Sequence, residues 1–211
     1  GSIFRLGGYV MAAYTWTLDA GSGSDDHLVI ISSNGEIAVY RGSDPSSATD
    51  WSVIGVFTMG RPLGRRCAVK FGGDLAVNTY EGVYPLGKGL LSSSVDRRVA
   101  LTDKIQNSVS QAASTLGSNF GWQVCLNADD NMLILNVPYG GGANYQYAQN
   151  TITGAWTVFS GWDAQVWLKA STGLYYGGST FVIKAWAGNA DITVPSTAVG
   201  CQAVWTFWTK A

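Results

Sequence analysis

The sequence predicts an all-β fold assembled from several small antiparallel sheets. Three observations lead to this prediction: glycine and aromatic residues are frequent, charged residues are few, and apolar strands separated by turn residues recur along the chain. With 27 glycines, 12% aromatic and 13% charged residues, the composition is typical of short strands joined by tight turns. The 211 residues are enough for one core or for two small ones.

Four segments predict β-hairpins, because each has an apolar strand, a turn rich in Gly, Asn or Ser, and a second strand. The residues around Trp51 and Trp156 share one pattern, which predicts a third strand after the first and the third hairpin. The four segments are 27–40, 74–86, 131–147 and 173–186.

The hairpins begin at leucines that lie about 40 to 60 residues apart, near the period of propeller blades. A single small sheet cannot bury both faces, so neighbouring sheets are expected to stack around an axis. The sequence therefore predicts a β-propeller-like array of about four blades over residues 1–211, as one domain or as part of a larger propeller. If the chain is complete in itself, segments 7–18 and 201–208 are expected to share a blade.

The longest interval between hairpins contains the one good helix candidate, residues 102–117. Thr102 is the expected N-cap, Asp103 lies in the first turn, and Gly117 ends the helix. The apolar residues of this segment fall on one helical face. We expect the helix to be an insertion that lies outside the propeller body.

The three cysteines, Cys67, Cys125 and Cys201, each lie in an apolar stretch. Their spacing fits no zinc motif, and an odd number does not favour a disulfide framework. We therefore expect buried free thiols, and folding in a reducing cytoplasm.

Charge and hydropathy limit the partners of the protein. A net charge of −1 gives no general electrostatic attraction to DNA or to membranes. The sequence holds no apolar run near the roughly 18 residues of a membrane span, and its first residues lack the order of a signal peptide.

The residues that catalysis usually needs are sparse. His27 is the only histidine, so a catalytic triad or a multi-histidine metal site is hard to assemble, and we expect it in a loop that enters a strand. Segment 19–26 lacks the EF-hand pattern and is interpreted as a flexible connection between blades. Asp129 and Asp130 are expected turn residues. The sequence predicts no catalytic residue, no cofactor and no metal site, and hence no enzyme.

Two glycine-containing loops, 60–67 and 140–144, lack the order of a phosphate-binding loop and are expected to be inter-strand turns. The first of them is unusually basic, and residues 67–71 after it predict a strand. A rigid turn with guanidinium groups can contact phosphates or carboxylates in pairs of hydrogen bonds. Its candidate contacts are a neighbouring subunit or DNA, with a solvated loop as the alternative. The basic residues are Arg61, Arg65, Arg66 and Lys70.

Four stretches, 7–67, 72–86, 101–123 and 132–156, resemble a family of tailed-bacteriophage virion proteins, β-propeller components of the head–tail junction or the tail nozzle. The resemblance implies the C-terminal portion of such a protein, made in the host cytoplasm and built into the virion. It further implies a structural ring around the DNA channel, for which we expect about six copies. The implied partners are other tail or portal-adaptor proteins, with DNA passing transiently through the channel.

Two other functions remain open at this stage. A carbohydrate-binding propeller for host attachment would present exposed aromatic side chains, for which Trp16, Trp51 and Trp156 are the candidates. A glycosidase would need two converging carboxylates, and Thr153 stands where the turn motif of sialidase propellers has an aspartate.

Overall fold

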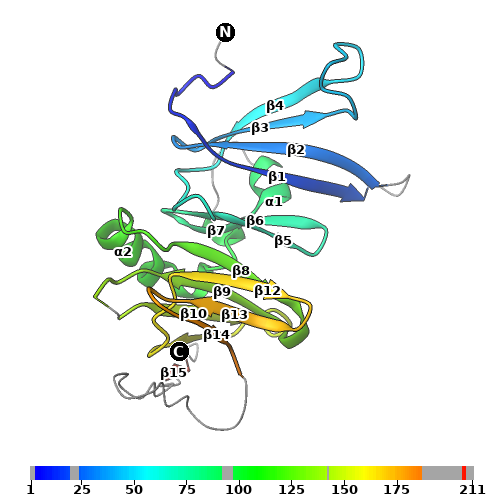
Figure 1. The fold of residues 1–211 in the computed structure, drawn as a ribbon. Helices are drawn as coiled ribbons and strands as arrows, with labels where there is room; N and C mark the ends of the chain where they lie inside the picture. The colour runs from blue at the N-terminus through cyan, green and yellow to red at the C-terminus, as the bar shows by residue number, and fades with distance from the viewer. Residues whose placement is uncertain (1–2, 20–23, 92–96, 142, 187–205, 208–211) are drawn as a thin grey trace. The chain divides into compact units, whose positions relative to one another are not determined.

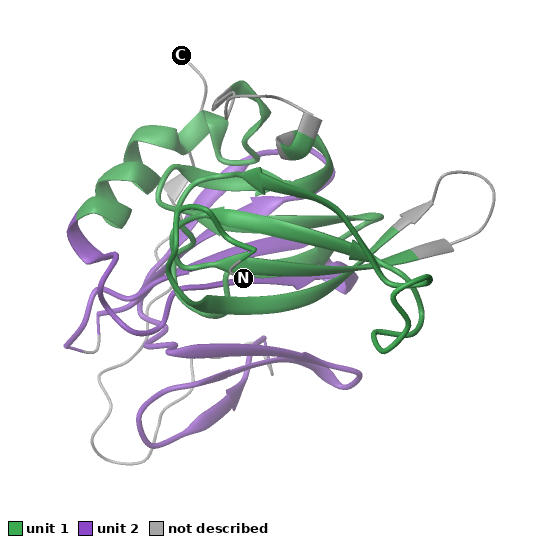
Figure 2. Ribbon diagram, turned by 90° about the horizontal axis from the view of Figure 1, so that it is seen from above, with its two compact units in different colours: residues 1–114 green, residues 115–211 purple. Residues whose placement is uncertain are grey.

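The computed structural model describes residues 3–19, 24–91, 97–141, 143–186 and 206–207. These residues form four antiparallel sheets and two short α-helices (Figure 1), which confirms the prediction of an all-β fold. The chain divides into two compact units, residues 1–114 and 115–211 (Figure 2). Within the described part of the chain, none of the helices is long and apolar enough to cross a membrane.

Unit 1 contains two sheets formed by strands that follow one another in the sequence. Sheet A consists of β1 (Val10–Asp19), β2 (Ser24–Ser32), β3 (Glu36–Arg41) and β4 (Ser52–Thr58). Sheet B consists of β5 (Ala68–Phe71), β6 (Asp74–Thr79) and β7 (Gly82–Pro85). The helical segments that follow are α1 (Leu86–Leu91), the 3₁₀ turns η1 (Arg97–Val99) and η2 (Asp103–Ile105), and α2 (Gln106–Leu116), whose last turn crosses into unit 2.

Unit 2 contains the other two sheets. Sheet C has the order β15-β11-β10-β9-β8, and sheet D has the order β12-β13-β14. Sheet C is formed by β8 (Gln123–Asn127), β9 (Met132–Val137), β10 (Tyr145–Asn150), β11 (Trp156–Phe159) and β15 (Thr206–Phe207), with the 3₁₀ turn η3 (Ala128–Asp130) between β8 and β9. Sheet D is formed by β12 (Val166–Ala170), β13 (Gly173–Gly177) and β14 (Val182–Lys184).

All four predicted hairpins are confirmed, and each belongs to a different sheet: β2–β3, β6–β7, β9–β10 and β13–β14. The predicted third strands are β4 and β11. The expectation that the first and last strands share a blade is wrong. β1 pairs with β2 in sheet A, whereas β15 pairs with β11 in sheet C. The closure of the four sheets into a propeller stays a prediction.

The core of unit 1 receives side chains from both of its sheets. Because side chains alternate along a strand, sheet A contributes every second residue of its central strands. Core residues of sheet A include Trp16, Val29, Ile31, Ile37 and Val39, and those of sheet B include Leu75, Val77 and Tyr84.

One tight approach fixes the β2–β3 turn against the chain that leaves β4. Gly35 has a φ of +90°, and a Cβ there would lie 2.5 Å from the backbone carbonyl of Gly60. The carbonyl of Gly35 accepts a hydrogen bond from Met59 N at 3.0 Å. Only glycine combines this backbone conformation with this closeness.

The core of unit 2 is aromatic and is also shared by both of its sheets. Cys125 and Ile134 of sheet C pack with residues of sheet D. Trp162, on the connection between β11 and β12, stacks on Tyr176 with ring centroids 5.6 Å apart, and its centroid is 5.6 Å from that of Trp167.

The predicted helix over 102–117 is confirmed, but it begins with a 3₁₀ turn and without the expected cap. Thr102 makes no side-chain capping bond. Its hydroxyl instead accepts a hydrogen bond from Val83 N at 3.1 Å, so β7 competes for the group that would cap the helix. The buried face carries Ile105, Val109, Ala112 and Ala113.

Candidate functional site

The basic loop, residues 60–67, leads from sheet A to sheet B and is fixed along the β6–β7 hairpin. Leu63 N donates a hydrogen bond to the carbonyl of Asn78 at 3.1 Å. Tyr80 N donates to the carbonyl of Arg61 at 3.0 Å. The loop backbone therefore has a defined position, as a rigid contact surface requires.

Tyr14 of β1 holds the other end of the basic loop. Its hydroxyl donates to the carbonyl of Arg65 at 3.3 Å and accepts from Ala68 N at 3.2 Å. Burial raises the pKa of Tyr14 to about 12. The phenol stays protonated at neutral pH and keeps both hydrogen bonds.

The four basic residues lie where the sequence predicted, in and just after this loop, with β5 confirming the predicted strand. Arg61, Arg65 and Lys70 are exposed, whereas Arg66 is half-buried. The guanidinium of Arg61 lies over the ring of Tyr80, 5.2 Å from its centroid. Contact with a neighbouring subunit or with DNA stays a prediction.

Cys67 and Cys125 are buried free thiols, as predicted. Burial raises the pKa of Cys67 to about 12 and that of Cys125 to about 11. Both are neutral at physiological pH, and a neutral thiol is a poor nucleophile and a poor metal ligand. Cys201 lies outside the described residues.

The expectation that His27 lies in a loop is wrong, because the residue lies inside β2. It is 5% exposed, and its ring centroid is 5.8 Å from that of Trp16.

The interpretation of segment 19–26 as a connection between blades is also wrong. The β1–β2 pairing reaches Asp19 and Ser24, so this segment joins two strands of the same sheet.

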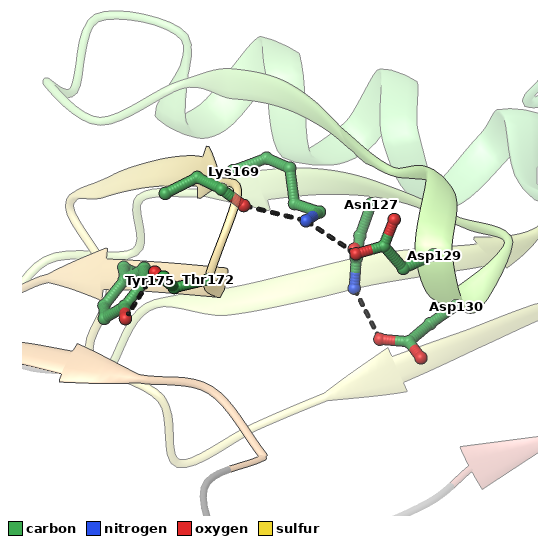
Figure 3. A network of polar contacts seen from close by, with 7 residues as sticks. Asn127, Asp129, Asp130, Lys169, Thr172 and Tyr175 are labelled. Atoms are coloured by element: carbon green, nitrogen blue, oxygen red, sulfur yellow. Dashed lines mark hydrogen bonds and ion pairs between the residues drawn. The ribbon is translucent and has the colours of Figure 1, made fainter.

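Asp129 and Asp130 lie in the turn between β8 and β9, as predicted, and both are held by structural contacts (Figure 3). The carboxylate of Asp129 pairs with Lys169 Nζ of β12 at 2.7 Å. The carboxylate of Asp130 accepts a hydrogen bond from Asn127 Nδ2 at 2.7 Å. The first of these contacts ties sheet C to sheet D.

The three tryptophans proposed as sugar platforms do not form an exposed row. Trp16 is 7% exposed and Trp156 is 2% exposed. Trp51 is half-buried and stacks on Tyr40, with ring centroids 5.5 Å apart. Two of the three therefore belong to the packed interior of their units.

The outer face of sheet A, opposite its core, carries the exposed Asp26 opposite Thr17 and, beside this pair, an uncharged area. Two cross-strand rows cover it, each with one residue from each strand. The exposed members at the two edges are Ala13, Thr15, Val53 and Val56. The rows are Ala13–Ile30–Ala38–Val56 and Thr15–Leu28–Tyr40–Val53.

Sheet D has an outer face that combines exposed apolar residues with one exposed charged residue, Lys184, in the same cross-strand row as Leu168. Its inner row includes Trp167 and Tyr176, which are buried in the core. On the opposite side, Val166 and Leu168 of β12 are 39% and 63% exposed, and Val182 of β14 is 78% exposed. We call these two surfaces the outer face of sheet A and the outer face of sheet D.

A buried amide network links sheets C and D, and Asn136 of β9 is its centre. Asn136 is fully buried, and its Nδ2 donates to the carbonyls of Gly121 at 2.8 Å and Ala164 at 2.9 Å. Its Oδ1 accepts from Trp167 Nε1 and Gln146 Nε2, both at 2.9 Å. All four bonds of this side chain are made inside the protein.

Gln123 of β8 extends the network, because its side-chain amide bonds the backbone of Trp167 as a neighbouring strand would. Its Oε1 accepts from Trp167 N at 2.8 Å, and its Nε2 donates to the carbonyl of Trp167 at 2.7 Å. A side-chain amide thus replaces backbone pairing where sheets C and D meet.

The network ends at a cavity of about 290 Å³. Asn144 connects the two: its Nδ2 donates to the Asp163 carboxylate at 2.8 Å and to the carbonyl of Ala164 at 3.2 Å. The glycine-containing loop 140–144, of which Gly142 is not described, joins β9 to β10 as predicted, and its residues Gly140, Gly141 and Asn144 line the cavity.

Comparisons with known proteins identify no relative: no family model matches the chain, and a search of curated proteins finds no similar sequence.

Proposed function

We propose that the protein is a non-enzymatic structural component of a tailed-bacteriophage virion. In this proposal the four sheets are blades of a β-propeller, and about six copies form a ring around the DNA channel as a tail nozzle or head–tail connector. The resemblance of four sequence stretches to that family suggests the setting. The ring would bind other tail or portal-adaptor proteins.

The observation that supports assembly most directly is the exposed apolar area on the outer faces of sheets A and D. The two cross-strand rows on sheet A contain no charged side chain, and the exposed residues of sheet D include Leu168 and Val182. Contiguous exposed apolar surface marks places where proteins bind one another. An apolar area on the outer face of a sheet is stabilised when another sheet packs on it.

The two faces differ in sequence and belong to different sheets, so a contact between them joins one copy to the next in a head-to-tail manner. Such heterologous contacts close into rings when the rotation between copies allows it. The net charge of −1 suits a channel through which DNA passes without being held.

Charge substitutions in the outer faces are expected to abolish assembly. Leu168→Lys on sheet D and Val56→Lys on sheet A each place an ammonium group where an apolar contact is proposed, and burying it unpaired is strongly unfavourable. Mass photometry and negative-stain electron microscopy should show rings for the unsubstituted protein and single copies for both variants.

Ile152→Lys is the matched control, because Ile152 is 75% exposed but lies in the turn after β10 and belongs to neither face. It should assemble normally. Unsubstituted protein that stays monomeric at high micromolar concentration, or variants that form the same rings, would contradict the proposal.

The basic loop supplies a separate test of the ring. Arg65→Ala is expected to leave the melting temperature unchanged, since Arg65 is exposed and only its carbonyl contacts Tyr14. If its guanidinium pairs with a carboxylate of the next copy, the loss of that desolvated contact costs about 2–5 kcal/mol and weakens assembly by about 30-fold or more.

Lys88→Ala, which removes an exposed cation of α1, is the control and should change neither quantity. Normal ring formation by Arg65→Ala would show that Arg65 is a solvated surface residue and not an assembly contact. Arg66 is a poorer choice for this test, because its side chain is half-buried and its removal would also alter packing.

A further inference from the structure

We propose that the cavity at the end of the amide network binds one ring of a neutral saccharide. The proposal concerns unit 2 alone and does not depend on the ring of copies. Its basis is the combination of a concave site, convergent amide and carboxylate groups, and an exposed aromatic ring.

The size of the cavity fits a small polar ligand. Its volume of about 290 Å³ is close to the lower end of the range of about 300–1,000 Å³ that is usual for small-molecule pockets. The side chains that line it include Asn119, Phe120, Pro138, Asn144, Asp163 and Gln165.

The polar groups of the lining are already oriented. Asn144 is only 6% exposed, and it holds the Asp163 carboxylate through its Nδ2 while its Oδ1 accepts from Gly140 N at 3.3 Å. Asn119 Nδ2 donates to the carbonyl of Pro138 at 2.9 Å. From the described residues, Asp163 Oδ2 and Asn119 Oδ1 accept no side-chain hydrogen bond, so both acceptors are available to ligand hydroxyl groups.

The apolar part of the site is equally suited to a sugar. Phe120 lines the site and is 77% exposed. A sugar ring presents hydroxyl groups at its edge and C–H groups on its face, and the face packs on an aromatic ring. Hydroxyl groups that both donate and accept match a lining of amides and one carboxylate.

The same lining disfavours the other common ligand classes. None of the described lining residues is basic, and the Asp163 charge repels phosphates and acidic ligands. A single carboxylate offers too few charged oxygens for calcium, and among the described residues no three metal-binding side chains gather. A purely apolar ligand would cover the Asp163 carboxylate and could not donate a hydrogen bond to its second oxygen.

The glycine-containing loop gives such a ligand access to the backbone. Gly140 and Gly141 have φ values of +92° and +62°, and a Cβ at either position would meet no atom within 4 Å. The wall at this point is therefore backbone with open space before it, which allows a ligand to approach the peptide groups closely.

The experiment is an NMR titration of the ¹⁵N-labelled full chain with the methyl glycosides of glucose, galactose, mannose and N-acetylglucosamine. We expect at least one glycoside to shift the amide signals of Gly140, Gly141 and Asn144, with a dissociation constant on the order of 1 mM. Glucuronic acid, added as an acidic sugar of similar size, should bind more weakly than glucose.

Two variants locate the binding. Phe120→Ala removes the stacking surface, and Asp163→Asn keeps the shape but removes the charge that strengthens a hydrogen bond. Each should weaken binding about tenfold. Ile152→Ala removes a side chain that is 75% exposed elsewhere in unit 2 and should bind as the unsubstituted protein does.

Three results would overturn the proposal. The first is that no neutral glycoside shifts the cavity signals, and the second is tighter binding of glucuronic acid than of glucose. The third is unchanged affinity in both Phe120→Ala and Asp163→Asn, which would place any sugar binding elsewhere.

Discussion

Asn136→Ala is expected to destabilise unit 2 by about 3–5 kcal/mol, the largest effect of any substitution considered for this unit. The side chain is fully buried and makes four hydrogen bonds. Its removal leaves the indole N–H of Trp167 and the carbonyl of Gly121 without a partner in the interior. Because network members polarise one another, the total exceeds the loss of one isolated bond.

Urea unfolding followed by tryptophan fluorescence measures this loss. Asn107→Ala is the matched control, because Asn107 is exposed on α2 and alanine is a good helix former. The control should be as stable as the unsubstituted protein or slightly more so. A loss below about 1 kcal/mol for Asn136→Ala would mean that water or other groups readily replace the amide.

Gly35→Ala is expected to destabilise unit 1 by about 2–4 kcal/mol, because two costs add at this position. Alanine is strained at a φ of +90°, and its Cβ would lie 2.5 Å from the backbone carbonyl of Gly60. To relieve that overlap, the β2–β3 turn must move away from the basic loop. The free energy of unfolding in urea again gives the size of the effect.

Gly72→Ala separates the two costs. Gly72 also has a positive φ, +61°, but a Cβ there would meet no atom within 4 Å. Gly72→Ala should therefore lower the free energy of unfolding only by the cost of the backbone conformation, about 1–2 kcal/mol. Equal losses for Gly35→Ala and Gly72→Ala would show that the approach to Gly60 contributes nothing.

The fold could be predicted from the sequence where its signals are local. The four hairpins have their turn residues and their alternating strands within about 15 residues, and all four were found. Helix α1 was not predicted, since it is six residues long and contains two glycines. It is held instead by a contact from outside, in which Gly87 N donates to the carboxylate of Asp74 at 3.0 Å.

The pairing of β1 with β2 was not predicted, although the two strands are neighbours in the sequence. Segment 7–18 was identified as a candidate strand, but its partner was assigned to the far end of the chain rather than to β2. The β1–β2 connection has no strong hairpin turn, and its composition of Gly, Ser and Asp is equally typical of a linker.

Of the candidate sites too, the one whose residues are close together in the sequence was predicted, and the one whose residues are far apart was not. The basic loop was visible because its arginines are close together in the sequence. The amide network was missed, since Gln123 and Trp167 are 44 residues apart and Asn136 and Ala164 are 28 apart. One signal was present: Asn136 interrupts the apolar run "LILNV", and a polar residue in a buried strand requires internal partners.

The strand order has a consequence for the way the chain acquires its structure. In sheets A, B and D every strand pairs with its neighbour in the sequence, so the loops to be closed are short and their entropy cost is small. These three sheets are able to form one after another as the chain leaves the ribosome. Sheet C differs, because β11 gains its last partner, β15, only after sheet D has been synthesised. The edge of β11 therefore stays open to wrong pairing during synthesis until β15 (Thr206–Phe207) pairs with it.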